Sequence, residues 1–404
     1  MSRRYGFREY DGPPLEALDL YTDKSGEEIV GQLYNFTDKG GREVALRPEM
    51  TPSLARILGE RSRSMPKPIR WFSVPQLFRY ERQQKGRLRE HFQWNVDLVG
   101  DDSVAADAEV LAVALDGLRE LGLSHEDFRA RISDRRLLSA IFRSEGVAGE
   151  RLGTAFQVVD KVERESPDRI IDRFEGEVGL GGQQARALLT LLREGELDAV
   201  AARYGSQEEV GSLLEALRGY LDRLEGLGFG AYARFDLSIV RGLAYYTGIV
   251  FELFDRKGEF RAICGGGRYD RLLERVGGEP LPAVGFGMGD VVLGELLAER
   301  GLRPEFRRQV DLFIVSVDSE QEPLALRIAR ALRDRGRSVM YGLKGQSVRK
   351  QFSQAGSEGA LRTLILGPEE VERGVGRIRE MEGGDERDVP LEALLAGDDT
   401  PDGR

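Results

Sequence analysis

Residues 78–100, FRYERQQKGRLREHFQWNVDLVG, decide how we interpret this chain. Two strand-like runs flank a loop that is rich in positive charge. In the second run apolar and polar residues alternate, so a strand would place Gln93 and Asp97 on one face. The first run alternates in the same way and brings Arg79 and Glu81 together. We therefore predict a β-hairpin with one apolar face and one polar face.

The loop of this hairpin concentrates basic side chains in a chain whose formal net charge is -10. These basic residues are Arg82, Lys85, Arg87 and Arg89. A solvated turn is the ordinary explanation for such a loop. A local basic cluster in an acidic chain also suits an anionic ligand, because binding of phosphate depends on local charge rather than on the sum. We predict that an anion binds at the hairpin.

Composition limits the chemistry that the chain can perform. With 404 residues, 41% hydrophobic and 32% charged, it is expected to be a soluble protein of about two or three domains. One cysteine rules out a disulfide framework within the chain, and two histidines make a zinc cluster or a catalytic triad implausible. Catalysis would therefore depend on carboxylates, arginines, amides and backbone groups. Without a membrane-length apolar run or a signal-peptide pattern, we expect a cytoplasmic protein.

Before the hairpin, a strand over residues 42–47 stops at Pro48. Thr51 is predicted to cap the following helix, with Pro52 at its first position. Glu49 and Thr51 then lie at a strand-to-helix junction. Taken alone, this junction is best explained as a capping turn.

After the hairpin the periodicity changes twice. Residues 135–227 have helical spacing almost throughout, which predicts a helical insertion without recognisable chemistry. Strands are expected at 232–240 and 249–254. Two glycine-rich stretches follow, CGGGRYD (264–270) and GFGMGD (285–290). Turns explain most such stretches, and the second lacks the acidic residue of a dinucleotide-binding fingerprint.

The last segment, from about residue 309, alternates strands and helices with short connections. This alternation predicts a small α/β domain. Ser319 and Glu322 are expected to form a capping box before its first helix. The final residues, 397–404, contain almost no apolar side chains and are expected to be a disordered tail.

Five stretches, in this order, resemble histidyl-tRNA synthetase, a class II aminoacyl-tRNA synthetase. They are ALRPEMT (45–51), FRYERQQKGR (78–87), VRGLAYYTG (240–248), GGGRYD (265–270) and PAVGFGMG (282–289). The resemblance implies an α+β fold in which helices flank an antiparallel sheet, with a helical insertion and a C-terminal α/β domain like an anticodon-binding domain. The implied boundaries are 1–133 and 229–302 for the catalytic domain, 134–228 for the insertion, 309–396 for the C-terminal domain and 397–404 for the tail.

The resemblance also implies a role for each polar position. Arg79 would clamp the α-phosphate of ATP and of the adenylate, which suits a planar guanidinium, and Arg241 would approach the reacting carboxylate of histidine. The implied ATP contacts are Arg79, Glu81 and Arg87; the histidine contacts are Glu49, Thr51, Gln93, Asp97, Arg241, Tyr246 and Tyr269; the tRNA contacts are Gln84 and Arg89. Adenylate formation needs positioning and cations rather than an acid–base histidine, which agrees with the composition.

The family further implies a homodimer that acts on histidine, ATP with Mg²⁺ and tRNA(His), with no tightly bound metal. This sequence departs from the family pattern in several places. Asp97 stands where the family usually has Glu, and Ala244 stands where Asp is common. Val292 replaces an arginine directed at the γ-phosphate of ATP, and such a contact is worth on the order of 3 kcal/mol. The N-terminal part keeps Pro13 but lacks most of a helix that forms the dimer.

Two other functions would account for parts of the sequence. A synthetase-like regulatory subunit of ATP phosphoribosyltransferase would explain Val292 and Ala244, but that paralogue lacks an anticodon-type domain. A non-catalytic RNA-binding protein would use the basic loop and leave the histidine-pocket residues without a purpose. The main hypothesis from the sequence is a histidine–tRNA ligase.

Overall fold

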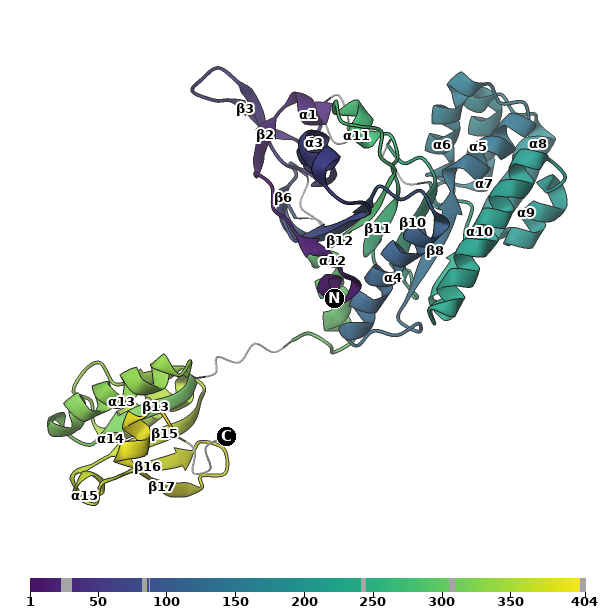
Figure 1. Cartoon of the computed structure of the whole chain (residues 1–404). Helices are drawn as coiled ribbons and strands as arrows, with labels where there is room; N and C mark the ends of the chain where they lie inside the picture. The colour runs from purple at the N-terminus through teal and green to yellow at the C-terminus, as the bar shows by residue number, and fades with distance from the viewer. Residues whose placement is uncertain (23–30, 82–85, 87, 241–244, 305–309, 400–404) are drawn as a thin grey trace. The chain divides into compact units, whose positions relative to one another are not determined.

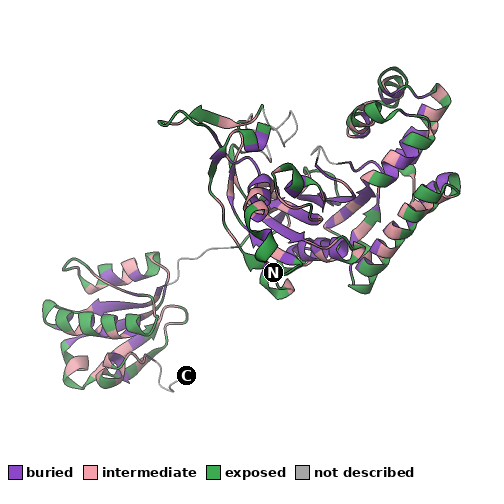
Figure 2. Cartoon of the chain, turned by 45° about the horizontal axis from the view of Figure 1, so that its top comes forward, coloured by how far each residue is buried: buried purple, intermediate pink, exposed green. Residues whose placement is uncertain are grey.

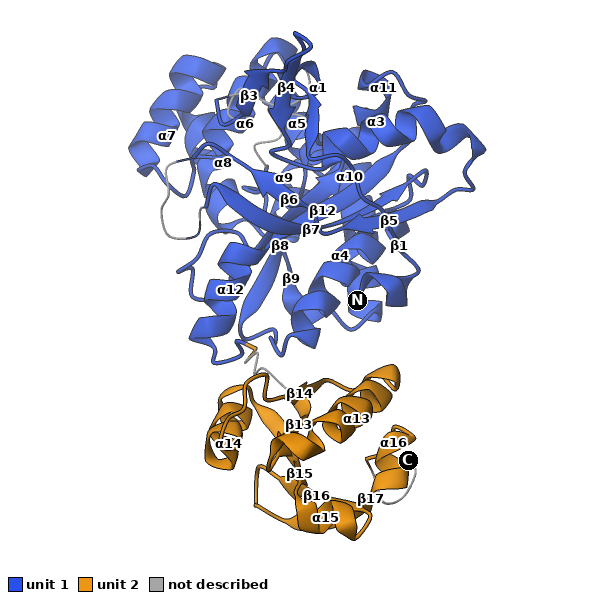
Figure 3. Cartoon of the chain, turned by 90° about the vertical axis from the view of Figure 1, so that its left-hand side faces the viewer, with its two compact units in different colours: residues 1–303 blue, residues 304–404 orange. Residues whose placement is uncertain are grey.

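The computed structural model describes residues 1–22, 31–81, 86, 88–240, 245–304 and 310–399. The chain divides into two compact units, residues 1–303 and residues 304–404, which are coloured separately in Figure 3. The helical insertion predicted at 134–228 belongs to the first unit. Each unit is described by itself.

The first unit is built on a large mixed sheet (Figure 1). Its strands follow the order β1-β5-β7-β12-β11-β10-β8-β9, and β6 also pairs with β7. Neighbours are antiparallel except for the parallel pairs β1·β5 and β8·β9. The strands are β1 (Arg8–Glu9), β5 (Ile69–Ser73), β6 (Gln76–Phe78), β7 (Glu90–Val99), β8 (Phe128–Asp134), β9 (Ala233–Phe235), β10 (Ile249–Asp255), β11 (Cys264–Arg268) and β12 (Ala283–Gly289).

The apolar face of this sheet packs on helix α4 (Val104–Glu120). The Ser103 side chain caps α4 by accepting a hydrogen bond from the Ala106 backbone N–H at 3.3 Å. Val96 of β7 and Leu111 of α4 are fully buried in this core. Burial of one such side chain contributes about 1.5–3 kcal/mol. The period-two alternation of β7 therefore orients its apolar side chains towards α4 and leaves Gln93 and Asp97 on the other face.

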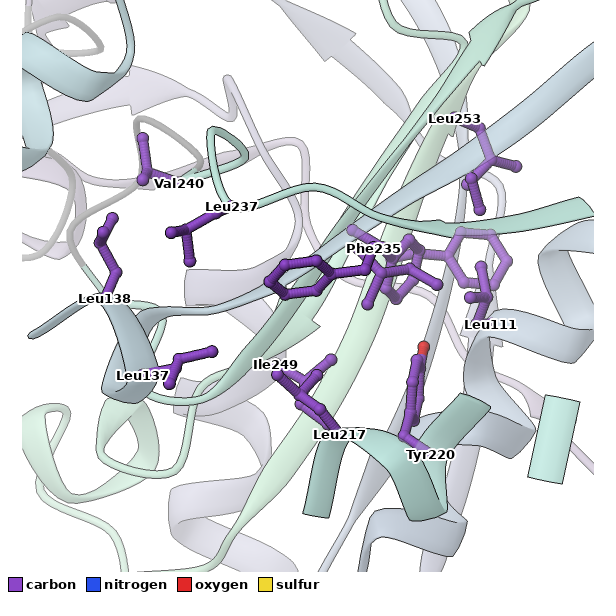
Figure 4. Close-up of a cluster of buried hydrophobic side chains, with 14 of the residues drawn as sticks. Leu111, Leu137, Leu138, Leu217, Tyr220, Phe235, Leu237, Val240, Ile249 and Leu253 are labelled. Carbon is purple, nitrogen blue, oxygen red and sulfur yellow. The ribbon is translucent and has the colours of Figure 1, made fainter. Parts of the chain in front are cut away.

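The insertion shares its core with the sheet. Figure 4 shows Leu217 and Tyr220 of α10 among side chains from the sheet and α4, including Leu111 and Ile249. Purple, buried positions follow the inner sides of these elements in Figure 2. The insertion contains α5 (Arg135–Ser144), α6 (Leu152–Val159), α7 (Pro167–Arg173), α8 (Gly182–Glu194), α9 (Leu197–Tyr204) and α10 (Glu208–Gly226).

A smaller antiparallel sheet of order β2-β4-β3 precedes the hairpin. The elements around it are β2 (Leu15–Ala17), α1 (Asp19–Thr22), β3 (Tyr34–Thr37), β4 (Glu43–Leu46) and α3 (Thr51–Arg61), and α11 (Leu272–Arg275) packs on α3. The predicted cap of α3 is wrong by one residue. Thr51 is already helical, and the cap position is Met50, whose side chain makes no capping hydrogen bond.

Three local predictions in the first unit are corrected by the structure. The strand expected at 232–240 is limited to β9, because Asp236 turns the chain by accepting hydrogen bonds from the backbone and hydroxyl of Ser238. Strand β6 ends at Phe78, so the first strand of the hairpin is shorter than the alternation suggested. Both glycine-rich stretches are strands rather than turns. A Cβ at Gly266 would lie 2.5 Å from the Gly285 carbonyl oxygen, so the strand packing itself requires glycine.

The second unit is a mixed sheet of order β14-β13-β15-β16-β17 with helices packed on it. Strands β14, β13 and β15 are parallel, and β16 and β17 continue in antiparallel fashion. The elements are β13 (Val310–Ser316), α13 (Glu322–Asp334), β14 (Val339–Tyr341), α14 (Val348–Ser357), β15 (Ala360–Leu366), α15 (Pro368–Glu372), β16 (Val375–Glu380), β17 (Glu386–Pro390) and α16 (Leu391–Leu395).

Two sequence expectations for this unit need correction. The turn before α13 is capped by Asp318, which accepts a 3.0 Å hydrogen bond from the Glu320 N–H, so Ser319 and Glu322 do not form the predicted capping box. Residues 397–399, expected to be disordered, belong to the folded unit. The side chain of Asp399 is 3% exposed and pairs with Arg362 at 2.7 Å.

Candidate functional site

The polar face of β7 lies beside strand β12, whose residues paired with that face are glycines. Asp97 pairs with Gly285 of β12. A Cβ at Gly285 would lie 2.1 Å from Asp97 Oδ1, and a Cβ at Gly287 would lie 2.7 Å from Gln93 Cδ. The carboxyl and amide groups therefore occupy space that only glycine leaves open.

A cavity of about 770 Å³ lies in the first unit beside this glycine floor, within the size range of small-molecule sites. Residues from β7, β10, β11, β12, the start of α12 (Asp290–Glu299) and the end of α6 line it. Its charged lining residues are Arg79, Glu81, Asp160, Glu163, Arg164, Glu252 and Arg261. Cations and carboxylates from several elements thus meet around one space.

Arg79 is held in place at one side of this cavity. Its Nε donates a 2.9 Å hydrogen bond to the Pro48 carbonyl oxygen, and its backbone N–H donates to the Arg89 carbonyl oxygen at 2.8 Å. The backbone bond anchors the residue, and the Nε bond orients its guanidinium at the cavity wall. The neighbouring His91 also lines the cavity, and burial together with the positive charge of Arg79 lowers its pKa to about 4. His91 is therefore neutral at pH 7.

Asp97 and Tyr269 form a buried pair on the same face of the sheet. The Tyr269 hydroxyl donates a 2.5 Å hydrogen bond to Asp97 Oδ1, and the two residues are 2% and 3% exposed. Burial raises the pKa of Asp97 to about 7, although the hydrogen bond from Tyr269 favours the ionised carboxylate. Near neutral pH this carboxyl group can therefore accept or donate a hydrogen bond.

The tyrosines of the family-like stretch 245–248 pack next to this pair. Tyr245 lies with its ring centroid 5.0 Å from Tyr246 and 5.9 Å from Tyr269. Its hydroxyl donates a 3.0 Å hydrogen bond to Oε2 of the buried Glu49. The family resemblance assigned a role to Tyr246 but not to Tyr245. The two adjacent tyrosines in this stretch were the sequence signal that could have indicated Tyr245 as well.

The structure divides the predicted residues into two neighbouring groups. Arg79, Glu81 and Gln93 line the cavity. Glu49, Asp97, Tyr246 and Tyr269 are buried beside it, and Thr51 is half-buried at the start of α3. Strand β7 connects the two groups because it carries both Gln93 and Asp97 on the polar face.

The remaining predicted residues belong to the hairpin loop and the 241–244 segment. Gln84, Arg87 and Arg241 lie outside the described residues, as does Ala244. Arg89 is exposed. Its guanidinium lies 4.7 Å from the centroid of the Tyr80 ring, and its Nε donates to the Glu81 carbonyl oxygen at 3.2 Å.

Two arginines of the cavity wall, Arg164 and Arg261, were missed by the sequence analysis. Arg164 belongs to the helical insertion, for which the sequence predicts no recognisable chemistry. Within the described ranges, no group of three or more His, Cys, Asp or Glu residues could hold a metal ion, and no helix is long and apolar enough to cross a membrane.

The family models identify both units of the chain. A model described as "Histidyl-tRNA synthetase" matches residues 1–290, and one described as "Anticodon binding domain" matches residues 311–397. The chain belongs to the histidyl-tRNA synthetase family. The resemblance inferred from the five sequence stretches is confirmed.

Curated relatives named histidine–tRNA ligase match nearly the whole chain. The Opitutus terrae enzyme is 43% identical over 395 residues, covering 97% of this chain and 90% of its own. The Haloarcula marismortui enzyme is 41% identical, covering 99% and 92%. The Arabidopsis thaliana chloroplastic/mitochondrial enzyme is 40% identical, covering 98% and 80%.

Solved structures confirm the expected class II synthetase fold. The histidyl-tRNA synthetase of Nostoc sp. PCC 7120 has a TM-score of 0.80 at 23% identity, covering 97% of this chain and 91% of its own. The apo S. aureus histidyl-tRNA synthetase has a TM-score of 0.67 at 25% identity, covering 97% and 90%. The catalytic sheet is mixed rather than purely antiparallel, because the short edge strands β1 and β9 pair in parallel.

Proposed function

We propose that this protein is a histidine–tRNA ligase, an ATP-dependent aminoacyl-tRNA ligase that activates histidine and transfers it to tRNA(His). The observation that carries the proposal is the polar face of β7 in a chain of this family. Gln93 and the buried Asp97–Tyr269 pair lie over the glycines of β12, and Arg79 is fixed at the adjoining cavity wall. Strand β7 thus positions groups for an amino acid, and Arg79, directly after β6, lies where it can bind a phosphate.

In the first step of this reaction, a carboxylate oxygen of histidine attacks the α-phosphorus of ATP. Histidyl-adenylate forms and pyrophosphate leaves. Arg79 binds the α-phosphate, where its planar guanidinium can form two parallel hydrogen bonds, and Arg241 binds the reacting carboxylate. Glu81 and Arg87 position ATP. Catalysis comes from positioning and from preorganised positive charge.

The histidine pocket in this proposal consists of the buried group next to the cavity. Asp97 faces the imidazole ring, and its elevated pKa lets it exchange the donor and acceptor roles with an imidazole of similar pKa. Glu49 and Thr51 bind the amino group, with Gln93, Tyr246 and Tyr269 completing the pocket. Glu49 is oriented by the hydrogen bond from Tyr245.

In the second step, a terminal ribose hydroxyl of tRNA attacks the carbonyl carbon of the adenylate, and AMP leaves. Gln84 and Arg89 bind the acceptor end, and the C-terminal domain predicted at residues 309–396, within the second unit, binds the anticodon. The family model matched there supports the second assignment. Because phosphate contacts provide much of such affinity, tRNA binding should weaken as salt rises.

Magnesium would arrive with ATP, because Mg²⁺ is usually bound by substrate phosphates and one or two carboxylates. Glu81 and Glu252 line the cavity and provide oxygen donors of the required kind. When bound, the ion would neutralise phosphate charge. We also propose that the protein acts as a homodimer in the cytoplasm, as the family resemblance implies.

The regulatory alternative also has a structural relative. A protein from Bacillus halodurans C, titled as an ATP phosphoribosyltransferase regulatory subunit/histidyl-tRNA synthetase, has a TM-score of 0.71 at 23% identity. The anticodon-binding family match and the relatives named histidine–tRNA ligase favour the ligase.

Histidine-dependent exchange of pyrophosphate into ATP tests the proposal. We expect exchange by the wild-type protein and its near-complete loss in Arg241→Ala. Arg234→Ala, which changes an exposed arginine of β9, is the control that should retain exchange. A folded wild-type protein that binds histidine but shows neither exchange nor aminoacylation would overturn the ligase in favour of the regulator.

A further inference from the structure

The start of α12 lies at the cavity but contributes an apolar side chain there. Val292 lines the cavity and is 9% exposed. The terminal phosphates of ATP carry most of its negative charge. If ATP binds as proposed above, a cationic side chain from another element is needed near this position.

Arg261 lies in the same part of the cavity as Val292. It belongs to the segment between β10 and β11, it is exposed, and it lines the cavity. Gly86 of the hairpin is the common neighbour of both residues. A Cβ added to Gly86 would lie 3.4 Å from Val292 Cγ2 and 3.9 Å from Arg261 Cδ. The side chains of Val292 and Arg261 therefore both approach Gly86, although they come from different elements.

The contacts of Gly86 support this arrangement. Its backbone N–H donates a 3.3 Å hydrogen bond to Glu295 Oε1 of α12. The bond ties this point of the hairpin to α12, so three separate elements meet around Gly86. Arg261 is thus placed by the fold at the junction of the hairpin and α12, on a different element from Arg79.

The other arginine missed by the sequence, Arg164, is a weaker candidate. It extends from the helical insertion, and unlike Arg261 it has no atom among those nearest to a Cβ added at Gly86. Arg79 follows β6 on the hairpin side and is the proposed ligand of the α-phosphate. Among the described residues lining the cavity, Arg261 is therefore the cation best placed to act where Val292 stands.

We infer that Arg261 binds the β- and γ-phosphates of ATP and replaces, from the β10–β11 segment, the cationic contact that Val292 does not make from α12. The inference rests on the proposed ligase function. A guanidinium at this point would stabilise the pyrophosphate leaving group as its P–O bond to the α-phosphorus breaks. It would contribute nothing to binding a ligand that lacks those phosphates.

Arg261→Ala separates this role from a general defect of the site. We expect kcat/KM for ATP in pyrophosphate exchange to fall about a hundredfold, the usual effect of removing one preorganised charge contact. Binding of a non-hydrolysable histidyl-adenylate analogue, measured by calorimetry, should remain within about twofold because the analogue has no β- or γ-phosphate. Arg256→Ala is the matched control, since this exposed arginine belongs to the same segment and does not line the cavity.

A second variant tests whether the charge at this position is what matters. Adding Val292→Arg to Arg261→Ala returns a guanidinium from α12, and we expect it to recover at least tenfold of the lost kcat/KM. The inference would be overturned if Arg261→Ala exchanged pyrophosphate with the wild-type kcat/KM for ATP. It would also be overturned if the variant lost as much affinity for the adenylate analogue as it lost in kcat/KM. A wild-type protein without exchange would instead overturn the ligase function, and the inference with it.

Discussion

Replacing Gly285 by Ala should displace the carboxyl group at the centre of the proposed histidine pocket. The added Cβ would lie 2.1 Å from Asp97 Oδ1 and 2.8 Å from the Val96 carbonyl oxygen, which belongs to the backbone of β7 and has little freedom to move. Gly285 does not have a positive φ angle. The cost is therefore steric rather than conformational.

The expected magnitude has two sources. Overpacking a close-packed site costs about 1–3 kcal/mol. Moving Asp97 away also breaks its buried hydrogen bond with Tyr269, and a buried polar group left unpaired costs about 1–3 kcal/mol. We expect the free energy of unfolding, measured by urea denaturation, to fall by a few kcal/mol. Histidine affinity should fall more than tenfold in calorimetry.

Gly289→Ala provides a matched control on the same strand and face. Its added Cβ would meet no atom closer than His91 Cδ2, at 4.0 Å. Its unfolding free energy should remain within about 0.5 kcal/mol of the wild-type value. The same small effect for Gly285→Ala would show that Asp97 does not need the space left by this glycine, and would refute the reasoning.

Two further predictions concern buried charge. The pKa of Asp97 rises from 3.8 to about 7 on folding, so between these pH values the folded state binds a proton that the unfolded state does not, and the stabilisation is lost as pH rises from about 4 to 7. In urea denaturation the free energy of unfolding should decline over this range, and Asp97→Asn should remove the decline. Identical pH profiles for the two proteins would contradict the prediction. Arg268 donates to Asp107 at 2.9 Å, and both side chains are at most 4% exposed, so Arg268→Ala should lower the free energy of unfolding by about 3–5 kcal/mol. Arg3→Ala, which breaks the exposed pair with Glu9, should change it little. Similar effects of the two changes in urea denaturation would rule out the buried pair as a stabilising contact.

The polar face of β7 could be predicted from sequence because a strand alternates its side chains with a period of two. That rule placed Gln93 and Asp97 together before any tertiary structure was known. It gave no information about β11 and β12. Glycine has no side chain to alternate, so a strand rich in glycine has no apolar period and is easily taken for a turn.

The contacts that complete the site come from residues far apart in the chain, which periodicity does not connect. Asp97 and Tyr269 are 172 positions apart, and the family resemblance alone suggested that they act together. Arg261 is the converse case. The family resemblance predicts a cation at the position of Val292. The proposed cation, Arg261, instead belongs to the β10–β11 segment, and only the fold brings that segment next to the hairpin and α12. A charge can move between elements as long as its place in the cavity is kept, because the field acting on a phosphate depends on the position of the guanidinium and not on the helix or loop that carries it.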